Sequence, residues 1–103
     1  MSSSDRLDRV FAALADPTRR AIVARLTAGD TAVLDLARPF QMSQPAVTKH
    51  LQVLERAGLV SQAKVARTRP RRLELKALAE LDAWLEPYRP YLKAGRLKEL
   101  KHD

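Results

Sequence analysis

The stretch that decides the fold is MSQPAVTKHLQVLERAGLV, residues 42–60. Its first residues carry the signals of a helix start, because the hydroxyl of Ser43 can cap a helix and Pro45 lies in the first turn, where a missing N–H costs nothing. Three apolar residues then recur at three- and four-residue spacing: Val47, Leu51 and Leu54. Gly58 can take the left-handed conformation that ends a helix. The stretch therefore predicts an amphipathic helix that ends near Ala57.

The other face of this helix carries side-chain types that contact base edges and phosphates. Gln44, Thr48 and Lys49 are the best candidates, because they lie near the helix start, the part that a recognition helix presents to bases. Ser43 can donate to a phosphate as well as cap the helix. His50 can either contact the DNA backbone or pack within the protein as a neutral ring. The candidate DNA contacts on this helix are Ser43, Gln44, Pro45, Thr48, Lys49, His50 and Gln52. The sequence thus predicts that this helix enters a DNA groove.

A basic hairpin is predicted directly after this helix, with strands at residues 60–66 and 71–75. Leu73 and Leu75 are expected to face the core, and the tip at residues 67–70 contains no glycine, which favours a loose loop over a tight turn. The side chains expected to contact phosphates or the minor groove are Lys64, Arg67, Thr68, Arg69 and Arg71. A helix followed by a cationic hairpin predicts a mainly α fold with a small β-hairpin: a winged helix-turn-helix with about five helices and a two-stranded wing.

Four further helices are expected around this unit. The first spans about residues 4–15, and the second begins after the cap Asp16 and ends near Gly29. A short third helix at residues 31–38 is expected to bury Val33, Leu34 and Ala37 in some combination, and a turn at residues 39–42 joins it to the recognition helix. The last helix begins at Lys76 and is expected to kink or divide at its two prolines, Pro87 and Pro90.

The first and last helices carry long apolar stripes. Such a stripe on a terminal helix either packs on the core of its own chain or pairs with a second copy, and we expect a mixture of the two with a two-fold dimer interface. The residues expected at that interface are Leu7, Val10, Phe11, Leu78, Leu81, Trp84, Leu85, Tyr88 and Leu92.

Length and charge agree with this picture. The 103 residues are enough for a single domain, residues 1–103, whose ends (1–4 and about 98–103) are expected to be flexible. Residues 41–75 hold seven basic and two acidic side chains, so +5 of the total charge of +7 lies in the helix and hairpin. Charge concentrated in this way indicates a polyanionic partner, and nucleic acid is the commonest one. Together with the helix predicted to enter a groove, it leads us to expect double-stranded DNA as the partner. A solubilising surface loop is the alternative explanation.

Several classes of protein are disfavoured by the composition. The chain has no cysteine, which excludes disulfides and thiolate sites. The N-terminus lacks the pattern of a signal peptide and no apolar run reaches the length of a membrane span, so we expect a cytoplasmic protein without a membrane partner. A nucleophile paired with a base, a phosphate-cradling glycine loop and a carboxylate–histidine cluster are all missing, so we expect neither an enzyme nor a cofactor.

Two motifs together resemble a known family. Residues 11–22, FAALADPTRRAI, are similar to the opening signature of ArsR-type winged-helix repressors, and residues 43–60 resemble their recognition helix. The likeness covers roughly residues 7–88. It implies a homodimer that binds an imperfect inverted repeat near a promoter and blocks transcription.

The sequence departs from the metal-sensing members of that family. These often carry a Cys-x-Cys pair in the third helix, where this chain has Ala32 and Leu34. The two histidines, His50 and His102, lie in the recognition helix and the tail and supply too few converging donors for a transition metal. The chain therefore resembles the metal-independent branch. Two alternatives stay open: a winged-helix protein-interaction module, and a repressor that responds to a small molecule.

Overall fold

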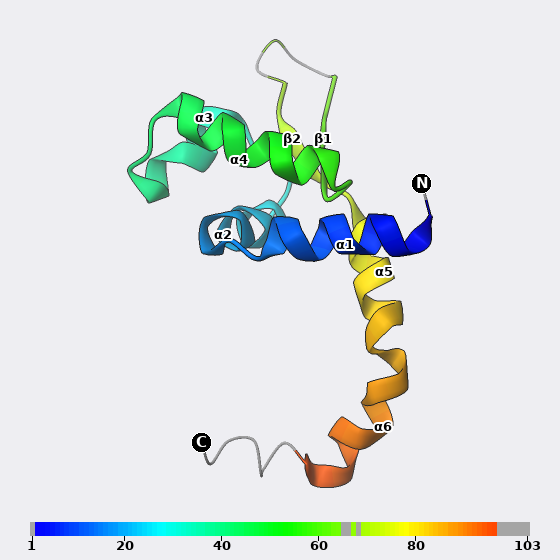
Figure 1. Cartoon of the computed structure of the whole chain (residues 1–103). Helices are drawn as coiled ribbons and strands as arrows, with labels where there is room; N and C mark the ends of the chain where they lie inside the picture. Colours follow the sequence, from blue (N-terminus) through cyan, green and yellow to red (C-terminus); the bar gives the residue numbers. More distant parts are fainter. Residues whose placement is uncertain (1, 65–66, 68, 97–103) are drawn as a thin grey trace.

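The computed structural model describes residues 2–64, 67 and 69–96. Five main helices surround one core: α1 (Ser3–Leu14), α2 (Pro17–Leu26), α3 (Val33–Ala37), α4 (Gln44–Arg56) and α5 (Leu75–Leu85). Strands β1 (Val60–Gln62) and β2 (Arg71–Leu73) form an antiparallel pair between α4 and α5. Figure 1 shows this hairpin, the wing (residues 59–74), projecting from the body beside α4. The predicted winged helix-turn-helix is confirmed.

Helix starts follow from side-chain caps. The Ser2 hydroxyl accepts from the Asp5 N–H and the Asp5 carboxylate accepts from the Ser2 N–H, so α1 begins at Ser3 instead of Ser4, within the stretch expected to be a flexible end. Asp16 caps α2 through the Arg19 N–H at 3.0 Å. The tail from residue 97 onward, expected to be flexible, lies outside the described residues.

The core lies where α1, α2, α3 and α4 meet. From α4 it receives the three residues that the helical spacing selects, and all three are fully buried: Val47, Leu51 and Leu54. Leu36 of α3 is also fully buried, whereas Leu34, expected to be an inward candidate, is 58% exposed. Between α3 and α4 lie the short helical turn η1 (Arg38–Phe40) and Gln41, whose φ of 53° makes the left-handed turn of the helix-turn-helix.

The hairpin is shorter than predicted. Val60 pairs with Leu73 and Gln62 with Arg71, and a bridge from Thr31 to Arg71 adds a third short strand contact. Glu74 then donates its N–H to the Leu59 carbonyl at 2.8 Å and the chain turns into α5. Leu75 is therefore the first residue of α5 and is 71% exposed, which corrects the expectation that it faces the core.

The C-terminal arm (residues 75–96) leaves the body and curves away from it (Figure 1). After α5 it continues through the short turns η2 (Glu86–Tyr88), α6 (Arg89–Tyr91) and η3 (Leu92–Arg96), so the helix is divided at Pro87 and Pro90 as predicted. Arg89 connects the pieces, because its guanidinium donates to the Asp82 carbonyl and carboxylate and to Glu86 at 2.9 Å. The Asp82 carboxylate raises the pKa of Arg89 above its usual value.

Candidate nucleic-acid interface

Helix α4 presents three different faces outside the core. Pro45, Lys49 and Gln52 are exposed on one side, and Arg56 lies on the same side at the end of the helix. Gln44 and Thr48 face the wing, while His50 and Val53 face α1 and α2. The structure therefore brings the candidate contacts of the recognition helix onto the open side and the wing side, with the exception of His50.

The helix begins as the sequence predicts. The Ser43 hydroxyl accepts from the Ala46 N–H at 3.3 Å, and Pro45 lies in the first turn. Since Ser43 uses its oxygen for the cap, capping is the role that its geometry supports. Gly58 closes the other end with a φ of +78°, the left-handed conformation that glycine tolerates.

The wing and the start of α4 share a cleft of about 270 Å³. Gln44 and Thr48 line it from α4, and Arg67 and Arg69 line it from the wing. Lys64, Arg67 and Arg69 are exposed, and none has a carboxylate partner among the described residues. Polar hydrogen-bonding groups and uncompensated cations in one concave surface suit a polyanion. Thr68, also a candidate contact, lies outside the described residues.

Arg71 is placed differently from the other wing cations. It is only 9% exposed, and its Nε donates to Oε1 of Glu55 in α4 at 2.9 Å. Its backbone forms two hydrogen bonds with Thr31: the Arg71 N–H donates to the Thr31 carbonyl at 2.8 Å, and the Thr31 N–H donates to the Arg71 carbonyl at 3.0 Å. Arg71 also lines the cleft shared by α4 and the wing, but Glu55 already compensates its charge, so it braces the wing against α4 and is less available to a phosphate than Arg67 and Arg69.

Two more wing residues have internal partners. Arg72 forms an ion pair with Asp30, with Nη2 and Oδ2 2.8 Å apart. The Arg72 hydrogen bond holds the pKa of the Asp30 carboxyl below its usual value, and Asp30 raises that of Arg72. Glu74 accepts from the Ser61 hydroxyl at 2.7 Å. The net charge of the wing is therefore carried outward by Lys64, Arg67 and Arg69.

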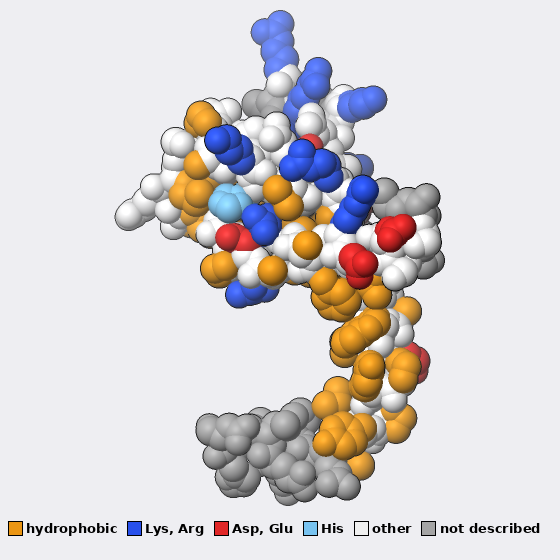
Figure 2. Space-filling model, in the orientation of Figure 1, with side chains coloured by type: hydrophobic (Ala, Val, Ile, Leu, Met, Phe, Trp, Pro, Cys, Tyr) orange, Lys and Arg blue, Asp and Glu red, His pale blue; other side chains and the backbone are white. Residues whose placement is uncertain are grey.

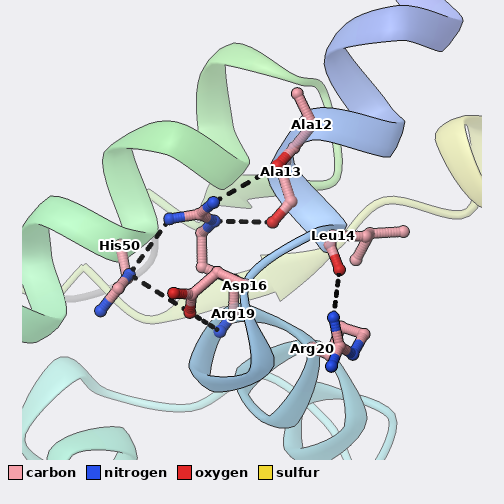
Figure 3. Close-up of polar contacts among 7 residues, drawn as sticks. All are labelled: Ala12, Ala13, Leu14, Asp16, Arg19, Arg20 and His50. Atoms are coloured by element: carbon pink, nitrogen blue, oxygen red, sulfur yellow. Dashed lines mark hydrogen bonds and ion pairs between the residues drawn. The ribbon is translucent and has the colours of Figure 1, made fainter.

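A polar cluster joins α4 to the loop between α1 and α2 (Figure 3). Nδ1 of His50 lies 3.9 Å from Oδ2 of Asp16 and 3.5 Å from Nη1 of Arg19. Arg19 also donates Nε to the Ala13 carbonyl at 2.6 Å. The N–H of Arg19 is the main cause of the lowered pKa of Asp16. His50 is half-buried in this cluster, so the packed reading of the histidine fits better than a contact with the DNA backbone.

Arg56 is a further exposed cation of α4, beyond the candidate contacts that the sequence indicated. It lies seven residues after Lys49, which places it two turns along the same side of α4. The signal was present in the sequence, because a basic residue at that spacing extends the cationic face of the helix.

The arm and α1 carry the apolar surface of the molecule, and Figure 2 shows it as a hydrophobic band along the arm, away from the Lys and Arg side chains near α4. Trp84 connects the two elements, because its ring centroid lies 5.2 Å from those of both Phe11 and Tyr88. Phe11, Trp84, Leu85 and Tyr88 are each 40–49% exposed.

The other expected interface residues are less accessible. Val10 is 1% exposed and belongs to the core of its own chain, which corrects its assignment to the dimer interface. Leu7, Leu78, Leu81 and Leu92 are half-buried, and of these Leu78 and Leu81 pack against the core.

The described residues offer no metal site: across 2–64, 67 and 69–96, no three histidine, aspartate or glutamate side chains converge. Over the same residues, no helix has the length and apolar character needed to cross a membrane.

The chain is similar in sequence to known DNA-binding regulators. A helix-turn-helix domain family matches residues 14–63. An HTH-type transcriptional regulator of Mycobacterium tuberculosis, Rv2034, is 44% identical over 88 residues, which cover 85% of this chain and 82% of that protein.

Two solved structures are similar in fold as well as sequence. An ArsR-like transcriptional regulator from Rhodococcus sp. RHA1 matches with a TM-score of 0.76 and 32% identity, covering 99% of this chain and 95% of that one. A homodimeric winged helix-turn-helix DNA-binding domain from Mycobacterium bovis, a possible ArsR-family regulator, matches with a TM-score of 0.68 and 28% identity over 84% of this chain and 80% of that one.

Proposed function

The chain belongs to the ArsR family of winged helix-turn-helix transcriptional regulators, and we propose that it acts as a homodimeric repressor that binds an inverted repeat in double-stranded DNA. The observation that carries the proposal is the shared cleft of α4 and the wing. It places Gln44 and Thr48 beside Arg67 and Arg69 without an opposing carboxylate among the residues that line it. Such a protein works in the cytoplasm, where the bacterial chromosome lies, and binds without catalysing a reaction.

The DNA contacts divide into two kinds. Gln44 and Thr48 at the start of α4 are proposed to read base edges, because an amide and a hydroxyl can donate to and accept from bases in the major groove. Lys49, Gln52, Lys64, Arg67 and Arg69 are proposed to hold phosphates or enter the minor groove, which positions the protein with little sequence preference. Arg56 extends this second group along α4.

The dimer is proposed to form through the aromatic cluster of Phe11, Trp84 and Tyr88 together with Leu85. The exposed rings supply a large apolar area and lose little side-chain freedom on binding. Aromatic residues of this kind are enriched among the anchors of protein interfaces. The homodimeric relative from Mycobacterium bovis supports this assembly. Two recognition helices related by a two-fold axis would address half-sites about one helical turn apart, roughly 34–36 Å.

Selection of bound fragments from the source genome tests the proposal. We expect enrichment of a palindromic site and a steep loss of affinity with salt, with a slope of log K of about −0.9 per phosphate contacted. A protein-interaction module, the alternative, would show no site enriched over competitor DNA.

The two kinds of contact can be separated on the selected site. Gln44→Ala is expected to relax base preference at one position of each half-site, at a cost of about 1–3 kcal/mol for the preferred base. Arg69→Ala is expected to weaken all sequences equally and to reduce the salt slope by about one contact. Equal, uniform losses from both variants would contradict base reading by α4.

A further inference from the structure

A second cleft, of about 450 Å³, lies between α1 and the C-terminal half of α4, and of its lining residues the proposed function uses Arg56 alone. Its walls are apolar: Ala12 and Ala13 come from α1, and Val53 and Ala57 from α4. Three arginines complete the lining, Arg9 from α1, Arg19 from α2 and Arg56 from α4. The volume falls within the usual range of small-molecule sites.

The cleft lies away from the wing side of α4 and from the apolar side of α1, and it borders the open side of α4 through Arg56. On α1, Arg9 lies two residues from both Leu7 and Phe11, which places it on the opposite side of the helix from the apolar side that meets Trp84. On α4, Val53 and Ala57 each lie nine residues beyond Gln44 and Thr48, two and a half turns away and therefore opposite the wing side. The cleft is thus accessible while a second copy is bound, and among its lining residues Arg56 is shared with the proposed DNA contacts.

The positive charge of the cleft indicates which kind of ligand it can bind. No carboxylate among the described residues lines the cleft, and Arg9 and Arg56 are exposed without an acidic partner in the part of the chain that the structure describes. Guanidinium groups match carboxylates in a fork geometry, and the alanine and valine walls suit a hydrocarbon body. The chemistry that fits both features is a small organic anion with an apolar part, such as a medium-chain carboxylate.

Arg19 connects the cleft to the recognition helix. Its guanidinium joins the Ala12 and Ala13 carbonyls at the end of α1 to His50 on α4, at 3.3, 2.6 and 3.5 Å respectively. An anion drawn to Arg19 competes with these partners and separates α1 from α4. It also places a negative charge beside the helix that faces DNA. Both effects weaken DNA binding.

We propose that the cleft between α1 and α4 binds small carboxylates with an apolar body, and that occupancy lowers the affinity for DNA. The first part of this proposal, binding of the carboxylate, is independent of the proposed function. The second part, regulation of DNA affinity, rests on it. By linkage, the carboxylate and the DNA must weaken one another by the same factor.

The experiment titrates the full-length protein, free of DNA, with octanoate and with its uncharged analogue octanamide, followed by amide NMR shifts. Octanoate is expected to give saturable shifts at Ala12, Ala13, Val53 and Ala57 and to bind about tenfold or more tightly than octanamide, the ratio for losing one charge-assisted hydrogen bond. Inorganic phosphate, which has charge but no apolar body, is expected to give weaker, unsaturated shifts.

Matched variants locate the site. Arg9→Gln is expected to weaken octanoate several-fold, whereas Arg25→Gln, which removes the same charge from an exposed position on α2 outside the cleft, is expected to leave it unchanged. Equal binding of octanoate and octanamide, or equal loss in the two variants, would overturn the site.

The regulatory part is measured on the selected DNA site. Saturating octanoate is expected to weaken DNA binding about fivefold or more, and bound DNA to weaken octanoate equally. Binding of octanoate with unchanged DNA affinity would overturn the effector role and leave the site. Failure to select any DNA site would count against the proposed function alone, because the octanoate titrations need no DNA.

Discussion

Helix α4 and the C-terminal arm contrast in what they leave exposed. α4 buries its apolar stripe within its own chain and exposes Lys49, Gln52 and Arg56, which water solvates well. The arm exposes Trp84, Leu85, Tyr88 and Tyr91, which water solvates poorly. A helix that buries its apolar side chains in its own core is left with charge and hydrogen bonds for binding a partner. A helix whose apolar side chains stay exposed can bind a partner through that apolar area.

The largest effect is expected from reversing the chemistry of the arm. Trp84→Glu places a charge where the indole ring contacts both Phe11 and Tyr88, so we expect a single-copy species by sedimentation. Affinity for the full palindrome should fall about 100-fold or more, because one recognition unit loses the gain from simultaneous binding. Trp84→Phe, which keeps an aromatic ring, should stay dimeric. A dimeric Trp84→Glu protein with unchanged affinity would show that the arm is not the interface.

The next effect separates structural from exposed cations within the wing. Arg71→Ala leaves Glu55 half-buried without its partner and should lower the free energy of unfolding by about 2 kcal/mol, below the value for a fully buried pair because Glu55 retains some water. Arg69→Ala should leave unfolding unchanged. Urea unfolding of both variants measures the difference. Equal free energies of unfolding for the two variants would contradict the bracing role of Arg71.

A smaller effect tests how firmly α4 is held at its start. Ser43→Ala removes the hydroxyl that accepts the Ala46 N–H and should cost about 1 kcal/mol in thermal or urea unfolding. Ser43→Thr retains an acceptor and serves as the control. If both variants were as stable as the parent protein, the cap would contribute nothing and the helix would depend on packing alone.

The smallest effect concerns Asp16, on the side of α4 away from the wing. Its pKa is lowered in the folded chain, mainly by the Arg19 N–H, so its ionised form stabilises the fold above the ordinary value of 3.8. That contribution is lost as the pH falls through the lowered pKa. Comparison with Asp16→Asn by urea unfolding should show a stability difference that shrinks as the pH falls through 3.8 and on through the lowered pKa. A difference independent of pH would contradict it.

The sequence predicts the recognition helix well because its signals are local. The cap at Ser43, the stripe of Val47, Leu51 and Leu54 and the stop at Gly58 all lie within one helix, and each is confirmed. The prolines of the arm are equally local signals, since a missing N–H interrupts a helix anywhere beyond its first turn.

Other features depend on distant partners and escaped prediction. Val10 belongs to an apolar surface of α1 wide enough for two neighbours, and periodicity alone does not say which residues meet the core and which stay exposed. The inward position of Arg71 requires Glu55, sixteen residues earlier. Leu75 faces outward because β2 ends at Leu73, where the chain begins to turn into α5. The roles of the candidate DNA contacts stay predictions.

The bond between Glu55 and Arg71 has a mechanical consequence. It fastens the wing to the far half of the recognition helix, so the two cannot adjust independently to the duplex. In the proposed complex, the distance between the major-groove contact of α4 and the minor-groove contact of the wing is then set by the protein, and the DNA conforms to it. Stretches that bend or narrow easily would be favoured even at positions that no side chain touches, so the pliability of an operator enters its recognition.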